Sequence, residues 1–234
     1  EQFREAALSY AAFQKYLSDI DINTIKDTIT DFHNTVKRLE KFRLAVDGDS
    51  ARRAAKCSEL ISFVNERAAY SDIIVARLEK GELPYRVTHN DTKINNVLFD
   101  EKTDKGLCVI DLDTIMRGSM LYDFGDAIRY GCNTAKEDEK DLDKIVFDKE
   151  KYEAYESAYI EVLGNTMTAK ERELLRIAPL IMTYELVIRF LTDYLEGDVY
   201  FKTHYADHNY YRARCQAKLL SEMEKWRDNK VGIL

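Results

Sequence analysis

The polar segment from Val87 to Asp100 carries side chains suited to phosphoryl-transfer chemistry. Within it, His89 comes two residues before Asp91, and Asn96 comes five residues after Asp91. An aspartate can accept the proton of an attacking hydroxyl group, and a nearby amide oxygen can hold a magnesium ion. Three fixed residues recur by chance in many proteins, so the spacing alone is also compatible with a solvated turn that Asp91 and Asn96 cap.

The residues that follow predict a β-hairpin that returns to this loop. Two short apolar runs, 97–99 and 107–110, flank a polar stretch that ends in Gly106. Asp111 and Asp113 come at the end of the second run, and residues two apart on a strand project from the same face. We therefore expect a cluster of oxygen donors made by Asp91, Asn96, Asp111 and Asp113. Such ligands suit magnesium with phosphate rather than zinc or copper.

A second motif in this region could be mistaken for the metal site. Asp123-Phe124-Gly125 spells the magnesium-binding triplet of protein kinases, but no apolar strand leads into it. Asp111 has both the preceding strand and a suitable distance from Asn96. We therefore assign the metal role to Asp111, and we predict that Asp123 is structural and accepts hydrogen bonds from backbone N–H groups near the catalytic loop.

The composition is that of an ordinary globular domain. The chain has 234 residues, of which 45% are hydrophobic and 33% charged, so one domain or a large lobe is expected. A net charge of −7 without a basic stripe argues against a nucleic-acid partner. Four scattered cysteines fit a reducing compartment, and no signal peptide or apolar run of about 18 residues is visible. These features predict a cytoplasmic protein with no membrane association.

Long helices dominate the rest of the prediction, because the chain has only two prolines and nine glycines. Thr168 and Glu171 form a predicted capping box, and Pro179 is expected to split or kink the helical segment that follows. Apolar residues recur at helical spacing within the ranges 3–20, 25–39, 57–78, 121–130, 152–162, 168–195 and 209–226. The predicted fold class is therefore α+β, predominantly helical with a small catalytic β-hairpin.

Three motifs, at 89–96, 110–113 and 122–126, together resemble the aminoglycoside phosphotransferase and choline kinase superfamily. The segments 88–93, 189–195 and 197–201 are more closely similar to those of the N-acetylhexosamine 1-kinase group. The resemblance runs over nearly the whole chain, and its motifs are specific when taken together.

This resemblance implies that residues 1–234 form a protein-kinase-like C-terminal lobe. Its expected parts are a helical subdomain at 1–80, a catalytic and metal-binding core at 85–130, and a helical acceptor-binding part at 148–228. No Gly-rich strand–turn–strand and no strand with a phosphate-pairing lysine is recognised. We therefore expect the N-terminal lobe that binds ATP to be absent from this chain, and the sequence leaves open whether that lobe is deleted or cleaved.

The resemblance also implies a kinase that uses ATP and Mg2+ to phosphorylate the anomeric hydroxyl of an N-acetylhexosamine or a related sugar. Asp91 would accept or orient the hydroxyl proton, while Asn96 and Asp111 would hold magnesium. Asp113 would either join the metal shell or bind sugar hydroxyls. Lys93 would either stabilise charge on the transferring group or face water.

Two further roles are open to more than one interpretation. His89 is expected to brace the loop backbone and not to act as a base. Arg189 lies between Ile188 and Phe190 in an apolar segment, where a charge is costly unless it is paired. It either forms a structural ion pair or, as the resemblance implies, donates a hydrogen bond to the bound sugar beside Tyr200. We favour the substrate-binding role for both residues.

Other functions compete with a sugar kinase. A kinase of another hydroxyl acceptor, such as choline, an amino alcohol or an aminoglycoside, is the nearest alternative. A non-catalytic pseudokinase-type binding module is a further alternative: the presence of Asp91, Asn96 and Asp111 argues against it, and the absence of a recognised ATP-binding lobe argues for it. A glycosyltransferase could use Asp111 and Asp113, but it would require an upstream nucleotide-binding α/β domain, where this sequence predicts helices. The identity of the acceptor, the nucleotide preference and the oligomeric state are not determined by the sequence.

Overall fold

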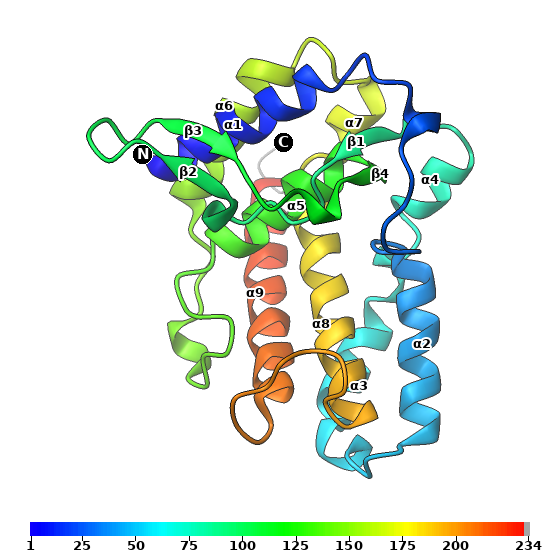
Figure 1. Ribbon diagram of the computed structural model, residues 1–234. Coiled ribbons are helices and arrows are strands. Elements are labelled where there is room, and N and C mark those ends of the chain that lie inside the picture. The colour runs from blue at the N-terminus through cyan, green and yellow to red at the C-terminus, as the bar shows by residue number, and fades with distance from the viewer. Residues whose placement is uncertain (232–234) are drawn as a thin grey trace. The chain divides into compact units, whose positions relative to one another are not determined.

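The computed structural model describes residues 1–231, which form α-helices and two small antiparallel sheets (Figure 1). The chain divides into two compact units, and each unit is assembled from three separate stretches of sequence. Unit 1 comprises Glu1–His33, Ala76–Cys132 and Asp148–Pro179. Unit 2 comprises Asn34–Val75, Asn133–Phe147 and Leu180–Leu234. The units are thus interleaved along the chain, whereas the subdivision predicted from the sequence used consecutive segments.

Unit 1 contains all the strands found within residues 1–231 and the helices that surround them. Its helices are α1 (Gln2–Tyr16), most of α4 (Val75–Glu79), α5 (Met120–Gly131), α6 (Lys149–Leu163) and α7 (Ala169–Leu174). Its strands are β1 (Arg86–Thr88), β2 (Val97–Phe99), β3 (Gly106–Val109) and β4 (Met116–Gly118). The unit therefore holds the whole segment in which the sequence predicts catalysis.

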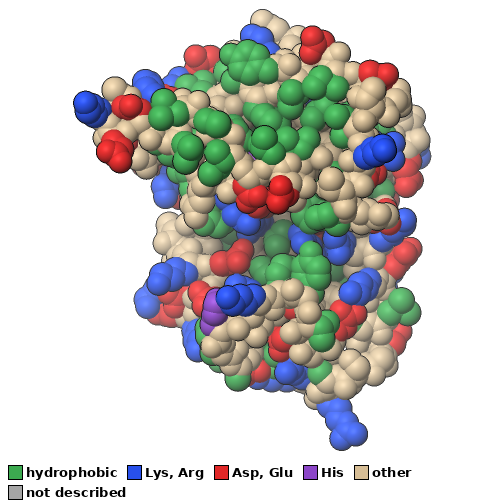
Figure 2. Space-filling model, in the orientation of Figure 1, with side chains coloured by type: hydrophobic (Ala, Val, Ile, Leu, Met, Phe, Trp, Pro, Cys, Tyr) green, Lys and Arg blue, Asp and Glu red, His purple; other side chains and the backbone are tan. Residues whose placement is uncertain are grey.

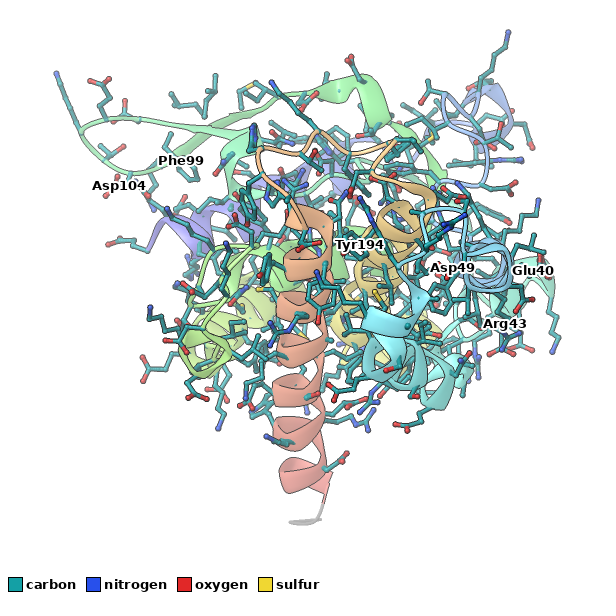
Figure 3. The ribbon with its side chains drawn as sticks, turned by 90° about the horizontal axis from the view of Figure 1, so that it is seen from below. Glu40, Arg43, Asp49, Phe99, Asp104 and Tyr194 are labelled. Carbon is teal, nitrogen blue, oxygen red and sulfur yellow. The ribbon has the colours of Figure 1, made fainter. Side chains whose placement is uncertain are left out.

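The predicted hairpin is confirmed. Strands β2 and β3 pair antiparallel, with Val97 opposite Val109 and Leu98 opposite Cys108. Figure 3 labels Phe99 in β2 and Asp104 in the turn, where a positive φ of 54° reverses the chain. The hairpin thus fixes the end of the loop that contains Asp91, since β2 begins one residue after Asn96.

A second sheet, formed by β1 and β4, was not predicted. Arg86 pairs with Gly118 and Thr88 pairs with Met116, so the strand before the catalytic loop lies beside the strand after Asp111. Each of these strands has only three residues, which is too short for an alternating pattern to be recognised. Together the two sheets hold both ends of the loop between β1 and β2.

Helix α1 supplies the core beneath the hairpin. The helix packs against α6 and β3. Ala6 and Tyr10 are buried against Val97, with Val109 packed beside them. This face follows the 3.6-residue period of a helix, which is why the sequence identified it as a core stripe.

Helix α5 is the centre of an aromatic cluster. Phe124 is fully buried, and its ring contacts those of three tyrosines on α6 at centroid distances of 5.3 to 6.3 Å, namely Tyr152, Tyr155 and Tyr159. The Phe of the Asp-Phe-Gly triplet is therefore a core residue. This placement positions Asp123, its neighbour in α5, in the interior of unit 1.

Unit 2 is helical in its described part. Its main helices are α2 (Thr35–Gly48), α3 (Ser58–Glu66), α8 (Ala178–Glu196, in this unit from Leu180) and α9 (His208–Val231). Helix α3 packs against α9, and the Tyr184 hydroxyl of α8 donates to the backbone oxygen of Val64 at 3.0 Å. Tyr194, labelled in Figure 3, lies near the end of α8.

Several helix predictions are confirmed and two are wrong. Helices α1, α5, α6 and α9 lie where expected, and the capping box of Thr168 and Glu171 is present at the start of α7. The segment around Pro179 is split as predicted, because α7 ends at Leu174 and α8 begins at Ala178.

The predicted helix at 25–39 is incorrect over its first half. Residues 25–33 are irregular, and α2 begins only after Asn34, whose side chain accepts the backbone N–H of Lys37 at 3.1 Å. The predicted helix at 57–78 is broken as well, because α3 ends at Glu66 and α4 begins at Val75. Within residues 1–231, no helix is both long enough and apolar enough to cross a membrane.

Candidate active site

The site is built from the loop between β1 and β2, whose backbone is held on several sides. Asn90 adopts a left-handed conformation with φ of 65°, so the chain turns sharply just before Asp91. The Asn90 side chain donates to the backbone oxygens of Thr88 at 3.2 Å and Thr114 at 2.9 Å. Strand β4 approaches so closely that a Cβ at Gly118 would lie 2.5 Å from the Thr88 hydroxyl oxygen. Only glycine fits there.

His89 links this loop to the residue before Asp111. Its ring is buried, with Nε2 lying 2.9 Å from the backbone oxygen of Ile110 and Nδ1 accepting the backbone N–H of Asp91 at 3.3 Å. One ring nitrogen therefore donates and the other accepts, which fits a neutral imidazole with its proton on Nε2. The contacts are those of a bracing residue, as the sequence predicted for His89.

Asp123 makes the backbone contacts that were predicted for it. Its carboxylate accepts the N–H of Asn90 at 2.7 Å and that of His89 at 3.0 Å. The Gln14 side chain donates to the same carboxylate at 2.6 Å, and Thr92 donates to the Asp123 backbone oxygen. Burial raises the pKa of Asp123 above its usual value, although the two backbone N–H groups oppose this shift.

A second buried acid lies one turn later on α5. Asp126 pairs with Arg129 at 2.8 Å, and both side chains are almost fully buried. Burial opposes ionisation, but the charge and hydrogen bond of Arg129 lower the pKa of Asp126 overall. The helix beneath the loop therefore carries a buried charge pair that sequence reasoning missed, although the i, i+3 spacing could have indicated it.

Asp91 is positioned through its side chain as well as its backbone. Lys93 Nζ lies 2.7 Å from Asp91 Oδ1, and Asn96 Nδ2 donates to Asp91 Oδ2 at 3.2 Å and to its backbone oxygen at 2.9 Å. The Asp91 side chain is about a quarter exposed, at 25%. Lys93 thus contacts the candidate base directly and does not merely face water.

The chain returns to this loop at Asp111. The backbone N–H of Ile110 donates to the backbone oxygen of Asn96 at 2.9 Å, which places Asp111 one residue from a direct contact with the loop. Asp111 has a left-handed φ of 61°, and its side chain is exposed. A non-glycine residue in this conformation is uncommon and marks a sharp turn.

The predicted common face for Asp111 and Asp113 is incorrect. Strand β3 ends at Val109, and residues 112–114 form a single 3₁₀ turn, so the alternation of a strand does not apply. Asp113 is held through its backbone oxygen, which accepts the Thr28 hydroxyl at 3.1 Å, and its carboxylate is exposed. The left-handed turn at Asp111 is the physical cause of the difference.

The donors near the loop fit a magnesium ion that is shared with phosphate. The two hydrogen bonds from the Asn96 side chain use Nδ2, so Oδ1 is turned away from Asp91 and can act as a ligand. Among the described residues, no three His, Cys, Asp or Glu side chains converge as a metal-binding cluster. Magnesium is commonly held by one or two carboxylates plus substrate phosphates, and Asp111 with Asn96 is a set of that kind.

The two predicted acceptor-binding residues, Arg189 and Tyr200, belong to unit 2. Arg189 Nη1 lies 3.5 Å from Glu185 Oε1 one turn earlier on α8, so the structural ion pair considered for Arg189 is present. The Tyr200 side chain is 62% exposed. Both residues nonetheless line one pocket of about 40 Å³, together with Arg38, Lys41, Ile188, Thr192, Asp193, Glu196 and Phe201.

A loop with a candidate aspartate base and a candidate amide ligand, followed by a hairpin and enclosed by helices, resembles the arrangement found in kinase-like phosphotransferases. Residues 3–158 match the sequence profile of the phosphotransferase enzyme family, APH, over more than half of the chain. The chain belongs to this family, whose members transfer phosphoryl groups to hydroxyl acceptors. The matched range includes Asp91, Asn96 and Asp111 but ends before Arg189 and Tyr200.

Proposed function

We propose that the protein is an ATP- and magnesium-dependent kinase of a small molecule, and that it phosphorylates the anomeric hydroxyl of an N-acetylhexosamine or a related sugar. One structural observation supports the assignment as a kinase. Asn96 binds Asp91 through its side chain and Ile110 through its backbone oxygen, so it joins the candidate base to the residue before the candidate metal ligand. The sugar acceptor is supported by the resemblance of segments 88–93, 189–195 and 197–201 to the N-acetylhexosamine 1-kinase group.

In this proposal Asp91 accepts or orients the proton of the acceptor hydroxyl. Lys93 Nζ lies 2.7 Å from the Asp91 carboxylate, so the ion pair holds this carboxylate in place at the point where the acceptor hydroxyl would meet it. The same ammonium group can stabilise negative charge on the transferring phosphoryl group. Asn96 restrains the other carboxylate oxygen, so the acceptor meets a base of fixed orientation.

Magnesium, when bound, neutralises charge on the β- and γ-phosphates of the nucleotide. We assign its protein ligands as Asn96 through Oδ1 and the exposed carboxylate of Asp111. Asp113, two residues further on, is assigned either to the metal shell or to a sugar hydroxyl. Asn96, Asp111 and Asp113 all belong to unit 1, and they lie at the two ends of the hairpin.

Exposed leucine residues of the hairpin favour a nucleotide-binding position next to these ligands. Leu98, two residues after Asn96, is 49% exposed, and Leu107 on the paired strand is 64% exposed. Figure 2 shows hydrophobic side chains on the surface over the elements of unit 1. Exposed apolar surface of this kind often marks a ligand-binding face, and an adenine ring would cover it.

Acceptor recognition is assigned to unit 2. Arg189 and Tyr200 line the same pocket, and Arg189 offers N–H donors that match sugar hydroxyl or acetamido oxygens. Because a water molecule needs roughly 10–15 Å³ of such space, the pocket of about 40 Å³ takes one polar substituent and not a whole hexose. We therefore assign the pocket to a substituent of the sugar.

A specific observation favours a cationic acceptor as the alternative. Lys140 Nζ lies 4.5 Å from the ring centre of Tyr205 and 4.6 Å from that of Tyr211, which shows that these two rings accept an ammonium group. A choline, amino alcohol or aminoglycoside acceptor presents the same chemistry. Substitution of Tyr211 by leucine separates the two functions, because it should impair transfer to a cationic acceptor and leave transfer to a neutral sugar unchanged.

The experiment that tests the proposal uses the longest form of the protein that its gene encodes, with ATP and magnesium. Transfer of the terminal phosphoryl group is measured against a panel of N-acetylhexosamines, other sugars, amino alcohols and aminoglycosides. Transfer confined to N-acetylhexosamines supports the proposal, and transfer to amino alcohols or aminoglycosides supports the alternative. Nucleotide binding without transfer to any hydroxyl compound would instead identify a pseudokinase-type binding module.

A further inference from the structure

Gln14 is a buried polar residue of α1 with one strong hydrogen bond. Its side chain is 5% exposed, and Nε2 donates to Asp123 Oδ2 at 2.6 Å. The other end of the same amide, Oε1, is buried without a hydrogen-bond partner among the described residues. An unsatisfied buried acceptor destabilises the folded state. A leucine or methionine would fill the same space without this penalty, so packing alone does not account for a glutamine here.

The carboxylate that Gln14 contacts is the one that holds the catalytic loop. Asp123 Oδ2 accepts the backbone N–H of His89 as well as that of the Gln14 amide, and Oδ1 accepts the backbone N–H of Asn90. The three donors surround the carboxylate from two directions, α1 on one side and the loop on the other. Because the carboxylate is buried, its orientation is set by these donors and not by water.

Helix α1 also holds the loop on the other side of Asp91. Tyr10 lies four residues before Gln14, on the same face of the helix, and its hydroxyl donates to the backbone oxygen of Lys93 at 2.8 Å. One contact of α1 therefore acts at residues 89–90 through Asp123, and the other acts directly at Lys93. Asp91 lies between these two points.

We propose that Gln14 is a positioning residue for phosphoryl transfer. By orienting the Asp123 carboxylate, it fixes the backbone of His89 and Asn90, and Tyr10 completes the support from the same helix. The proposal rests on the proposed function in one respect, namely that Asp91 is the base. The hold of Gln14 on the loop is a separate structural claim and is measurable without any substrate.

The test compares Gln14→Met with Gln2→Met. Methionine has nearly the shape of glutamine but no N–H donor. Gln2 is a matched control, because it lies on the same helix and donates to Asp104 Oδ1 at 2.8 Å, but that bond is exposed and does not involve Asp123 or residues 89–96. Amide hydrogen exchange is followed residue by residue, and kcat and KM are measured for the acceptor that the panel identifies.

For Gln14→Met we expect amide exchange at His89 and Asn90 to accelerate about tenfold. We expect kcat to fall about tenfold, with the KM for the acceptor and the KM for ATP each within twofold of wild type. Gln2→Met should resemble wild type in every measurement. Tyr10→Phe, a milder variant, should lower kcat about threefold without changing exchange at His89 and Asn90.

Three results would overturn the proposal. One is wild-type exchange at His89 and Asn90 together with wild-type kcat in Gln14→Met. A second is a loss of kcat without faster exchange at those amides, which removes the route through Asp123. The third is faster exchange throughout unit 1, which would reduce Gln14 to a packing residue. A wild-type protein that transfers no phosphoryl group refutes the proposed function instead, and the exchange data still decide whether Gln14 holds the loop.

Discussion

Two buried aspartates, Asp123 on α5 and Asp193 on α8, each hold an irregular segment by its backbone N–H groups. Asp123 accepts the N–H groups of His89 and Asn90, and Asp193 accepts those of residues 199–201 at 2.7 to 3.0 Å. Each carboxylate also accepts one side-chain amide, from Gln14 at 2.6 Å and from Asn209 at 2.8 Å. The same arrangement therefore supports the candidate base in unit 1 and the candidate acceptor residue Tyr200 in unit 2.

The two arrangements differ in how far they reach along the chain. The backbone partners of Asp123 lie 33 and 34 residues away in sequence, whereas those of Asp193 lie only six to eight residues away. The loop at 89–96 thus depends on the completed fold of unit 1, while the turn at 199–201 is a local structure at the end of α8. The family match includes only the former. The residues proposed for the reaction chemistry therefore lie within the family match, and those proposed for acceptor binding lie outside it.

The largest effect is expected at the base. Asp91→Asn removes the proton acceptor, so kcat should fall by about a thousandfold or more. Steady-state kinetics measure the loss, and thermal unfolding checks that the fold is intact. Asp104→Asn in the hairpin turn is the control and should leave kcat unchanged. Near-normal turnover in Asp91→Asn would remove the assigned role.

Removal of the Asp123 carboxylate should lower the unfolding free energy more than removal of the Asp193 carboxylate. Asp123→Ala leaves two backbone N–H groups and the Gln14 amide without an acceptor in the interior of unit 1, so we expect a loss of roughly 2–4 kcal/mol of unfolding free energy. Asp193→Ala should cost less, about 1 kcal/mol, because the buried Asn209 amide still donates to Asp198 Oδ1 at 2.9 Å. Val199 and Tyr200 are 75% and 62% exposed, so water can replace the acceptor that this turn loses. Chemical denaturation measures both values. Equal losses would contradict the distinction between a long-range and a local support.

Residues of the local turn should affect acceptor binding and not the chemical step. Tyr200→Ala is expected to raise the KM for the acceptor roughly three- to tenfold, or about 1 kcal/mol, with little change in kcat. Val199→Ala is a matched control, because Val199 is its exposed neighbour but does not line the pocket. A decrease in kcat without a change in KM for Tyr200→Ala would contradict the assignment of Tyr200 to acceptor binding.

The smallest effect concerns the response to acid of an ion pair in unit 2. Lys56 lies 2.7 Å from Asp207 and lowers the pKa of Asp207 below its model-compound value of 3.8. A lowered carboxylate pKa in the folded state stabilises the protein above pH 3.8, and this stabilisation is lost as the pH falls below that value. Because the pair is partly exposed, its contribution is at most about 1 kcal/mol and is screened by salt.

Unfolding free energies of wild type and Asp207→Asn are compared at pH 3 and pH 7, in low and high salt. The two proteins should differ at pH 7 in low salt, and the difference should decrease as the pH falls to 3 or as the salt concentration rises. The Asp126–Arg129 pair of unit 1 is buried, so its contribution should persist in high salt. A salt-resistant difference for Asp207→Asn would contradict this contrast between the units.

Local patterns predicted part of the structure around the candidate site. The hairpin, the capping box at Thr168 and the contacts of Asp123 followed from turn residues, spacing and the absence of a strand before Asp123. These features were accessible because neighbours in sequence determine them. The same holds for the assignment of Asn96 and Asp111 to one region, which needed only the short hairpin between them.

Features that depend on distant segments were not predictable in this way. The left-handed turn at Asp111 and the pairing of β1 with β4 arise from contacts that no local pattern records. Gln14 lies among the apolar residues of α1, and periodicity cannot show which buried residue faces a carboxylate. The irregular segment 25–33 has a helical pattern of isoleucines, but the cap at Asn34 starts the helix later.

We propose that the loop and the hairpin bring Asn96 and Asp111 together around a metal–nucleotide complex. Nuclear magnetic resonance with Mn2+, which takes the place of magnesium and broadens nearby signals, tests it directly. In the presence of ATP, the signals of Asn96 and Asp111 should broaden first, and Asp111→Ala should abolish the effect at both. Broadening centred on other residues, or unchanged by Asp111→Ala, would contradict the assignment of the site.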